Sequence, residues 1–237
     1  MKLAIIGAGE GSRLKSEGVI LPKPLVKIAG ECMIDRIIRI GAKAGVDSVH
    51  CILNENSQEV VEHLKKNKYA VPLNIKIKNT KSSLHSLFEL NKYLTEPFLM
   101  ATVDSIFKTE EYLEFVSFAK TQNDFAAVLG ITSFIDDEKP LCVTIDNTNK
   151  ITSFSDEKQN HEWATGGVYY FKPEIFSLAD LAIKLQIKRL RNFLKLLLMN
   201  GSPILAYKFS KIIDVDHLKD ITTAKEFLNQ YENKLIN

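Results

Sequence analysis

Several features that mark common protein classes are scarce in this sequence. Its three cysteines, Cys32, Cys51 and Cys142, are widely spaced and fit neither a disulfide framework nor a zinc site. Each lies in an apolar context, so we expect buried, reduced thiols. No apolar run approaches the ~20 residues of a membrane span, and no signal peptide is evident. We therefore expect a cytoplasmic protein that makes no contact with a membrane.

An excess of charge of one sign is also missing. Lys and Arg number 31 against 29 for Asp and Glu, and this balance does not suggest a nucleic-acid-binding protein. The hydrophobic fraction of 45% and the charged fraction of 25% are ordinary for a globular protein. A chain of 237 residues can bury a full core, so we predict one domain over 1–237, made of a half at 1–130 and a half at 131–237.

Apolar runs alternate with helical patterns through the first half. We predict strands at 3–6, 49–53, 73–77, 98–103 and 125–129, and helices at 32–45, 57–67, 82–94 and 109–120. This alternation predicts an α/β fold, a doubly wound three-layer α/β/α domain with a mostly parallel mixed sheet, whose ligands bind at the carboxyl ends of the strands. The second half predicts a small antiparallel excursion with strands at 141–145, 150–154 and 164–171, then a helical stretch 175–200, a strand 204–208 and a helix 217–234.

The segment 181–200 is predicted as a single helix rich in leucine, lysine and arginine. Such a helix can lie on a membrane surface, but packing in a core or against a second subunit is the favoured interpretation. The oligomeric state is open between a monomer and a homodimer.

A glycine-rich turn follows the first strand, in the run Gly7-Ala8-Gly9-Glu10-Gly11-Ser12-Arg13. Glycines after a buried strand allow a tight turn and bring backbone N–H groups close to an anion. Arg13 and Lys23, the latter between Pro22 and Pro24, add two cations for a polyphosphate. The spacing matches neither a P-loop nor the dinucleotide fingerprint, which disfavours a nicotinamide-dependent oxidoreductase.

This run and the following Pro22-Lys23-Pro24-Leu25 resemble the signature of the sugar-phosphate nucleotidyltransferases, and the similarity continues to Val46. The resemblance implies an enzyme that joins an NTP and a sugar 1-phosphate into an NDP-sugar and releases pyrophosphate. It implies that 1–130 binds the nucleotide and 131–237 the sugar phosphate, commonly in polysaccharide assembly. Arg13 and Lys23 would be catalytic, and Gly7, Ala8, Gly9, Gly11 and Ser12 would bind the nucleotide.

Carboxylates with the positions expected of metal ligands follow two strands. Asp104 ends the apolar run 98–103, where it would face a ligand crevice. Asp214 and Asp216 alternate on a short strand and so face the same way. The resemblance implies that Asp104 and Asp216 hold Mg²⁺, with Asp214 as the weaker candidate, because Mg²⁺ takes few protein ligands and leaves room for phosphate oxygens. Capping the next helix is the alternative role of Asp216.

Further matches to the family concern the two substrates. Glu157 and Lys158, followed by Gly167 in the next strand, would inherit sugar-phosphate binding, although the usual proline after the lysine is Gln159 here. Ser82 and Ser83 stand where a Gly-Thr pair often contacts the nucleotide, and capping of their own helix is the alternative. The base and the acceptor therefore stay open.

Two other functions stay open. One is a cytidylyltransferase acting on phosphocholine or a related phospho-alcohol, for which Glu162, Trp163 and Tyr169 could form a cation pocket. The other is a regulatory protein that binds a nucleotide sugar without catalysis. The second would be expected to lack some of Arg13, Lys23, Asp104 and Asp216, and all four are present.

Overall fold

The computed structural model describes residues 1–7, 11–159 and 161–231, and within them nine strands form one central mixed sheet. The strands are β1 (Lys2–Ile6), β4 (Ser48–Leu53), β5 (Leu73–Ile77), β6 (Phe98–Thr102), β8 (Ala127–Thr132), β9 (Cys142–Ile145), β10 (Ile151–Ser155), β11 (Trp163–Phe171) and β12 (Ile204–Phe209). Their order is β10-β9-β11-β6-β1-β4-β5, and β8 pairs with β11 and β12. The predicted α/β fold with a mixed sheet is confirmed.

Parallel pairing is concentrated in the first half of the chain. β1 runs parallel to both β4 and β6, and β5 completes this region as the edge strand that its alternating sequence predicted. β11 joins β6 in the antiparallel sense and also pairs with β8 and β9. The predicted antiparallel excursion is therefore a continuation of the main sheet, in which the long strand β11 connects the two halves.

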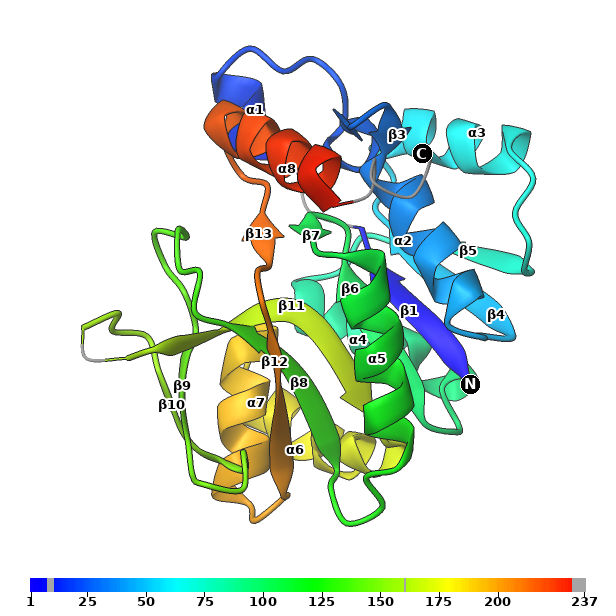
Figure 1. Ribbon diagram of the computed structural model, residues 1–237. Helices are drawn as coiled ribbons and strands as arrows, with labels where there is room; N and C mark the ends of the chain where they lie inside the picture. Colours follow the sequence, from blue (N-terminus) through cyan, green and yellow to red (C-terminus); the bar gives the residue numbers. More distant parts are fainter. Residues whose placement is uncertain (8–10, 160, 232–237) are drawn as a thin grey trace.

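Helices cover both faces of the sheet (Figure 1). One core lies under α2 (Met33–Lys43), α3 (Gln58–Lys66) and α5 (Thr109–Lys120). The opposite core lies under α4 (Ser83–Leu90), α6 (Ala179–Lys184) and α7 (Leu190–Met199). The short 3-10 turns are η1 (Lys23–Leu25), η2 (Asn91–Tyr93) and η3 (Pro173–Leu178). This is the three-layer arrangement that the alternating sequence pattern predicted.

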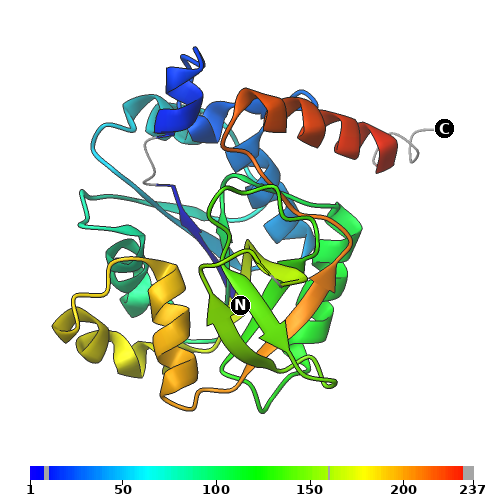
Figure 2. The same ribbon diagram turned by 90° about the vertical axis from the view of Figure 1, so that its left-hand side faces the viewer.

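A third apolar cluster closes one end of the molecule. It joins α1 (Ser12–Ser16) and α8 (Leu218–Tyr231) with the small pairs β2 (Lys27–Ile28) with β3 (Glu31–Cys32) and β7 (Ser105–Ile106) with β13 (Ile213–Asp214). Both views show α1 and α8 at the same end, beyond the main sheet (Figure 2). Helices α1 and α8, which lie near opposite ends of the chain, thereby meet beyond the carboxyl end of β1.

The prediction of a single helix over 181–200 is wrong. The chain forms α6, then a turn, then α7, because Gln186 adopts φ +56° and the N–H of Ile187 donates to the carbonyl of Ala182 at 2.9 Å. This is a left-handed helix C-terminus of the kind that usually has glycine, which the sequence pattern did not signal. The break matters because it brings Arg189 to the functional cleft.

The predicted state of the cysteines is confirmed: Cys32, Cys51 and Cys142 are all buried and free. No helix among the described residues is both long and apolar enough to cross a membrane.

Glu89 of α4 provides a test of how the edge strand is held. Lys76 and Lys78 donate to its carboxylate at 2.6 and 2.8 Å, and these bonds lower its pKa from 4.5 to about 2. Between these two pKa values, Glu89 binds more protons in the unfolded chain than in the folded chain. The two ion pairs therefore stabilise the fold fully above the unfolded pKa of Glu89, and this stabilisation is lost as the pH falls toward 2. We expect Glu89→Gln to lower the free energy of unfolding by about 1 kcal/mol near neutral pH. Urea titrations between about pH 6 and pH 3 should show this difference shrinking, and a constant difference would contradict it.

Candidate active site

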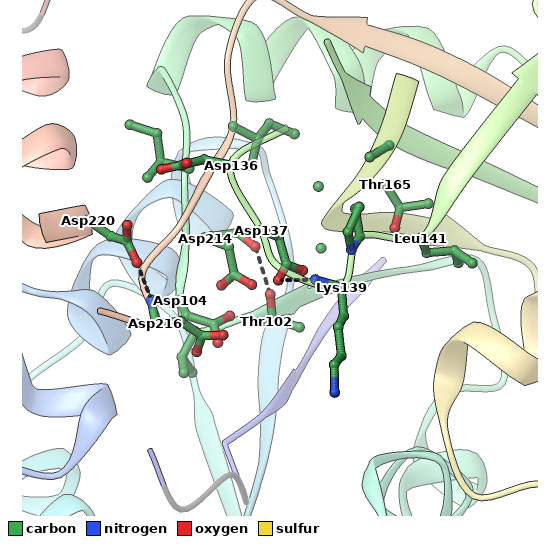
Figure 3. A pocket seen from close by; sticks show the side chains of 18 of the residues that line it. Thr102, Asp104, Asp136, Asp137, Lys139, Leu141, Thr165, Asp214, Asp216 and Asp220 are labelled. Atoms are coloured by element: carbon green, nitrogen blue, oxygen red, sulfur yellow. Dashed lines mark hydrogen bonds between the residues drawn. The ribbon is translucent and has the colours of Figure 1, made fainter. Parts of the chain in front are cut away.

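A cleft of about 700 Å³ opens where the carboxyl ends of β1 and β6 meet the loops of the second half. Its walls come from the glycine turn, the turn after β6, the segment 132–141, the middle of β11 and the strand β13. Figure 3 shows Asp104, Asp214 and Asp216 gathered in this cleft, with Lys139, Leu141 and Thr165 across from them. The cleft lies where parallel sheets bind ligands.

The glycine turn forms one wall. Gly7 leaves β1 with its N–H bonded to the carbonyl of Ile52 at 3.0 Å, and a Cβ there would lie 2.8 Å from Leu53. Gly11 has φ +59°, precedes α1 and faces the stem of Lys23. Gly7, Gly11 and Ser12 line the cleft as predicted, whereas Ala8 and Gly9 lie outside the described residues.

Lys23 is the buried cation of the site. Its side chain is only 8% exposed and emerges from η1, whose flanking prolines fix the backbone. Its Nζ lies 2.5 Å from Asp104 Oδ2 and 2.5 Å from Asp216 Oδ1. One lysine therefore joins carboxylates from two segments that are 112 residues apart in the chain (216 minus 104).

Arg13 is the second cation, and it is more accessible, with 39% of its side chain exposed. It forms an ion pair with Asp216 and lies 3.8 Å from Glu138. Arg13 and Lys23, the two predicted cations, thus both contact Asp216, the second predicted metal ligand, from the same wall of the cleft.

The carboxylates come from two short paired strands. β7 and β13 pair Ser105 with Asp214, and the N–H of Val215 donates to the carbonyl of Asp104 at 3.1 Å. This pairing places carboxylate oxygens of Asp104, Asp214 and Asp216 within 4.8 Å of one another. The structure therefore brings together both predicted metal ligands, and it adds Asp214 to them as a neighbour.

Asp220 fixes the backbone of this strand end. Its carboxylate is buried and accepts the N–H groups of Asp216 and His217 at 3.0 and 2.7 Å. Asp220 thus bonds back to the residues before α8, as the third residue of a capping box does, while Glu17 accepts the N–H of Leu218 at 2.7 Å. That leaves the Asp216 side chain for the cations and the cleft.

The electrostatics of the group are strongly coupled. Burial alone would lower the pKa of Lys23, but the charges of Asp104 and Asp214 raise it, so the amine is firmly protonated. Burial opposes ionisation of Asp104, yet the adjacent Lys23 holds the pKa of that carboxyl below its usual value. Partial loss of hydration within the cleft and the negative charge of Asp104 raise the pKa of Asp214, although its side chain stays exposed to solvent. A further cation would relieve this concentration of negative charge.

Gly167 of β11 lines the cleft at a point of close packing. It has φ +75°, and a Cβ there would lie 2.2 Å from Ser105 Oγ and 2.4 Å from Thr102 Oγ1, which bond each other at 2.7 Å. The backbone of β11 can approach the turn after β6 only because this residue has no side chain.

Gly201 offers a matched comparison, because it has φ +76° with no atom near its missing Cβ. We expect Gly201→Ala to lower the free energy of unfolding by about 1 kcal/mol through backbone strain alone. Gly167→Ala should cost at least ~2 kcal/mol more, because Thr102 or Ser105 must move. Equal losses in denaturant titrations would show that Gly167 is not tightly packed.

Two of the three residues expected on the sugar side, Glu157 and Lys158, lie outside the cleft, whereas Gly167 lines it. Glu157 and Lys158 are exposed and do not line it; Lys158 instead donates to the carbonyl of Ile135 at 2.6 Å, behind the segment 132–141. Two arginines that the sequence interpretation missed, Arg189 and Arg191, do line the cleft. Arg191 is held by Asp156 at 3.3 Å and by the carbonyl of Lys139 at 2.7 Å.

Ser82 and Ser83 have separate positions. Ser82 is the N-cap of α4, bonds His85 Nδ1 at 2.8 Å and does not line the cleft. Ser83 lines the cleft, and the N–H of the following Leu84 donates to the carbonyl of Lys188 at 3.4 Å, just before α7. The capping role is therefore realised by Ser82, and Ser83 is the one with access to a ligand.

His217, beside Asp216, connects the end of α1 to the cleft. Its Nδ1 lies 2.5 Å from Glu17 Oε1, and this hydrogen bond, followed by the charge of Glu17, raises the pKa of the imidazole. Its Nε2 lies 3.7 Å from Glu138. The same histidine thus contacts Glu17, which follows α1, and Glu138, which lines the cleft.

A mixed sheet with helices on both faces, and a cleft that combines a glycine turn, a buried and an accessible cation, and clustered carboxylates, define a nucleotide-binding α/β protein. The family model for nucleotidyl transferases matches residues 2–231, so the chain belongs to the nucleotidyl transferase family. The resemblance noted in the sequence is thereby confirmed.

Individual relatives are more distant. A mannose-1-phosphate guanyltransferase from Yarrowia lipolytica is 26% identical over 189 residues, covering 76% of this chain and 52% of that protein. An adenosylcobinamide-phosphate guanylyltransferase from Methanocaldococcus jannaschii is 29% identical over 108 residues, covering 45% of this chain and 53% of that protein. The chain spans about half the length of these curated relatives.

Solved structures share the fold over nearly the whole chain. The inositol-1-phosphate CTP transferase from T. maritima superposes with a TM-score of 0.80 at 18% identity, covering 97% of this chain and 96% of that one. A Bacillus anthracis protein described as a glucose-1-phosphate thymidylyltransferase, solved with sucrose, gives a TM-score of 0.81 at 18% identity, with coverage of 96% and 94%. At this identity the likeness establishes the fold alone.

Proposed function

We propose that this protein transfers a nucleoside monophosphate from an NTP to a sugar 1-phosphate, releasing pyrophosphate and forming an NDP-sugar. The observation that carries the proposal is the meeting of Lys23 with Asp104 and Asp216 beside the glycine turn. A buried, permanently charged amine between carboxylates, at the end of a parallel strand, suits the binding and reaction of phosphates.

The nucleotide half of the cleft would hold the triphosphate against Gly7, Gly11 and Ser12, all of which line it. Arg13 is the accessible cation and would bind the departing pyrophosphate. Lys23 would neutralise the α-phosphate. Ser83 lines the cleft and is the better of the two serines for contact with the nucleoside, because Ser82 is engaged in capping.

A divalent cation belongs to this proposal, and the donor set fits one. Asp104, Asp214 and Asp216 present oxygen ligands within 4.8 Å of one another, the kind that Mg²⁺ prefers. Asp104 and Asp216 would hold Mg²⁺, and Asp214 would act as a further ligand or through water. The ion would add positive charge at the reacting phosphates.

The acceptor would lie in the other half, against β11 and the segment 132–141. Arg191 lines the cleft and bonds the carbonyl of Lys139 in this half, and a guanidinium matches a phosphate with two parallel hydrogen bonds. Gly167 brings the backbone of β11 close to the carboxylates, so an acceptor phosphate lying on it would be near Lys23. Glu157 and Lys158, which the resemblance favoured, would contribute only if their loop moved inward.

The reaction requires positioning more than proton transfer. An oxygen of the acceptor phosphate attacks the α-phosphorus, and the bond to the oxygen that bridges the α- and β-phosphates breaks. The attacking oxygen is already ionised near neutral pH, so no general base is needed. Lys23 and Arg13 offset the charge that develops on the α-phosphate and on the leaving pyrophosphate.

A second candidate is cytidylyl transfer to a phospho-alcohol with a cationic group. Asp136, Asp137 and Glu138 line the acceptor half, which is the observation in its favour. The aromatic residues expected for such a pocket are divided, since Tyr169 lines the cleft while Trp163 does not and has Lys208 Nζ 4.9 Å above its ring. The named relatives act with different bases and acceptors, so they favour no one pair for this chain.

The test is pyrophosphate release with Mg²⁺ across four NTPs and a set of acceptors that includes hexose 1-phosphates, inositol 1-phosphate and phosphocholine. One productive combination with a sugar 1-phosphate supports the main proposal, and phosphocholine with CTP supports the second. Nucleotide binding without turnover across the whole set would contradict both and leave a regulatory binding protein.

Arg191 allows the acceptor half to be tested separately. We expect Arg191→Ala to raise KM for the acceptor by about 10- to 100-fold with little change in KM for the NTP, because a charge-assisted contact to phosphate is lost. Lys195→Ala is the matched control, since Lys195 pairs with the same Asp156 but does not line the cleft. If Lys158→Ala produced the larger effect instead, the loop at 157–158 would be the phosphate site.

A further inference from the structure

A second group of potential ligands lies away from the cleft, between α2 and α3. Cys32 ends β3, Asp35 lies in the first turn of α2, and His63 lies in the last turn of α3. Figure 1 shows β3 and the start of α2 beside α3. A sulfur, a carboxylate oxygen and a ring nitrogen of these three residues lie within 4.8 Å of one another, and none of the three lines the cleft.

The separations are close to those of a metal site. His63 Nε2 lies 2.8 Å from Asp35 Oδ2 and 3.0 Å from Oδ1. Ligand atoms around a tetrahedral Zn²⁺ with bonds of about 2.0–2.3 Å are about 3.3–3.8 Å apart. Side-chain shifts of about 1 Å would therefore bring all three atoms into one coordination sphere.

A neighbouring side chain orients the carboxylate of Asp35. The Tyr69 hydroxyl donates to Asp35 Oδ1 at 2.7 Å, which fixes the carboxylate and leaves Oδ2 directed at His63. Hydrogen bonds of this kind to a ligating carboxylate are a regular feature of protein metal sites. The side chains of Asp35 and His63 are 23% and 26% exposed, so an ion can reach them from solvent.

His63 presents a ring nitrogen to the other two residues. Its Nε2 faces the carboxylate of Asp35 on one side and Asn67 Nδ2 at 3.0 Å on the other. The Asn67 amide also donates to the carbonyl of His63 at 3.1 Å, so it keeps a partner when the lone pair of Nε2 is taken. A metal ion between Nε2 and Asp35 Oδ2 would take one lone pair from each atom.

We propose that Cys32, Asp35 and His63 form a binding site for Zn²⁺ or a similar borderline-soft cation, with a water molecule as the fourth ligand. The thiol of Cys32 gives up its proton to solvent when the ion binds. Thiolate and imidazole donors favour Zn²⁺, whereas the all-oxygen group at Asp104 favours Mg²⁺, so the two sites differ in the ion they select. The ion would link the start of α2 to the end of α3.

Cobalt titration of the purified, metal-free chain tests this site through the thiolate ligand. We expect one Co²⁺ per chain with a near-ultraviolet sulfur-to-cobalt absorption band, which one equivalent of Zn²⁺ abolishes. Cys32→Ser should remove the band and weaken Zn²⁺ binding by more than ~100-fold, whereas Cys142→Ala, which removes a buried cysteine elsewhere, should leave both unchanged. Tyr69→Phe should weaken binding by about 10- to 100-fold while the band persists.

His63→Gln provides a second route if Cys32→Ser does not fold, with the same expected loss of Zn²⁺ affinity. Cobalt binding without a sulfur band overturns the proposal, as does equal Zn²⁺ affinity in the Cys32→Ser and wild-type chains. Binding that survives Cys32→Ser but is lost in Asp104→Asn would assign the ion to the cleft and also overturn it. The result is independent of transfer activity, because the measurement is made without nucleotide.

Discussion

Asp104→Asn is expected to lower the rate of pyrophosphate release by about 10³-fold or more while the chain remains folded. The substitution keeps the shape of the side chain but removes the charge that faces Lys23 at 2.5 Å. It also removes one of the three clustered oxygen donors. Because the reaction depends on positioned charge, the loss should fall mainly on kcat at saturating NTP and acceptor.

Asp146→Asn is a suitable control for this variant. Asp146 lies in the turn between β9 and β10, where its carboxylate accepts the N–H groups of Thr148 and Lys150 at 2.8 and 3.0 Å. Its replacement removes one negative charge outside the cleft and should leave the rate unchanged. Turnover of Asp104→Asn within a few-fold of wild type, at equal thermal stability, would remove Asp104 from the mechanism.

The side of the cleft formed by the glycine turn and Asp104 was predictable because it depends on short-range sequence. Gly7 and Gly11 follow a buried strand directly, and Asp104 follows another, so the convergence of parallel strand ends brings them together. Lys23 lies twelve residues after Gly11 in a stiff proline-flanked turn (23 minus 11). Its approach to Asp216 could be expected only from the family resemblance, since no local pattern links the two segments.

The acceptor side was harder to predict because it depends on a break in a helix. The leucines of 181–200 satisfy a helical pattern throughout, and the left-handed conformation falls on Gln186 rather than on a glycine. The break makes Arg189 the N-cap of α7, and Arg189 lines the cleft there together with Arg191. The β7–β13 pairing has the same character, since two-residue strands carry no periodicity and yet place Asp214 beside Asp104.

The cluster of Cys32, Asp35 and His63 could not be predicted from the sequence for a different reason. Counting cysteines argued against a zinc site, because no second cysteine has a suitable spacing. The other two donors come from the first turn of α2 and the last turn of α3, and only the packing of these helices brings Asp35 and His63 to Cys32. A mixed donor set of this kind has no sequence signature.

Lys23→Met is expected to lower kcat by about 10²- to 10³-fold and to change stability in a way that depends on divalent cations. In the wild-type chain Lys23 Nζ is the cation that lies between Asp104 and Asp216, with Asp214 close by. Without it, the carboxylates repel one another, so the melting temperature in chelator should fall. Added Mg²⁺ should then raise the melting temperature more than it does for the wild type, because the ion replaces the missing charge.

Lys27→Met is the matched control, because Lys27 is exposed in β2 and does not line the cleft. It should change neither turnover nor the response to Mg²⁺. Arg13→Ala should also lower kcat, but with a smaller change in stability, because 39% of the Arg13 side chain is exposed and charge pairs of that kind contribute little. Near-normal turnover of Lys23→Met would contradict its role at the α-phosphate. A stability loss that Mg²⁺ does not reverse would instead mean that Lys23 acts mainly in packing, since its stem lies against Gly11.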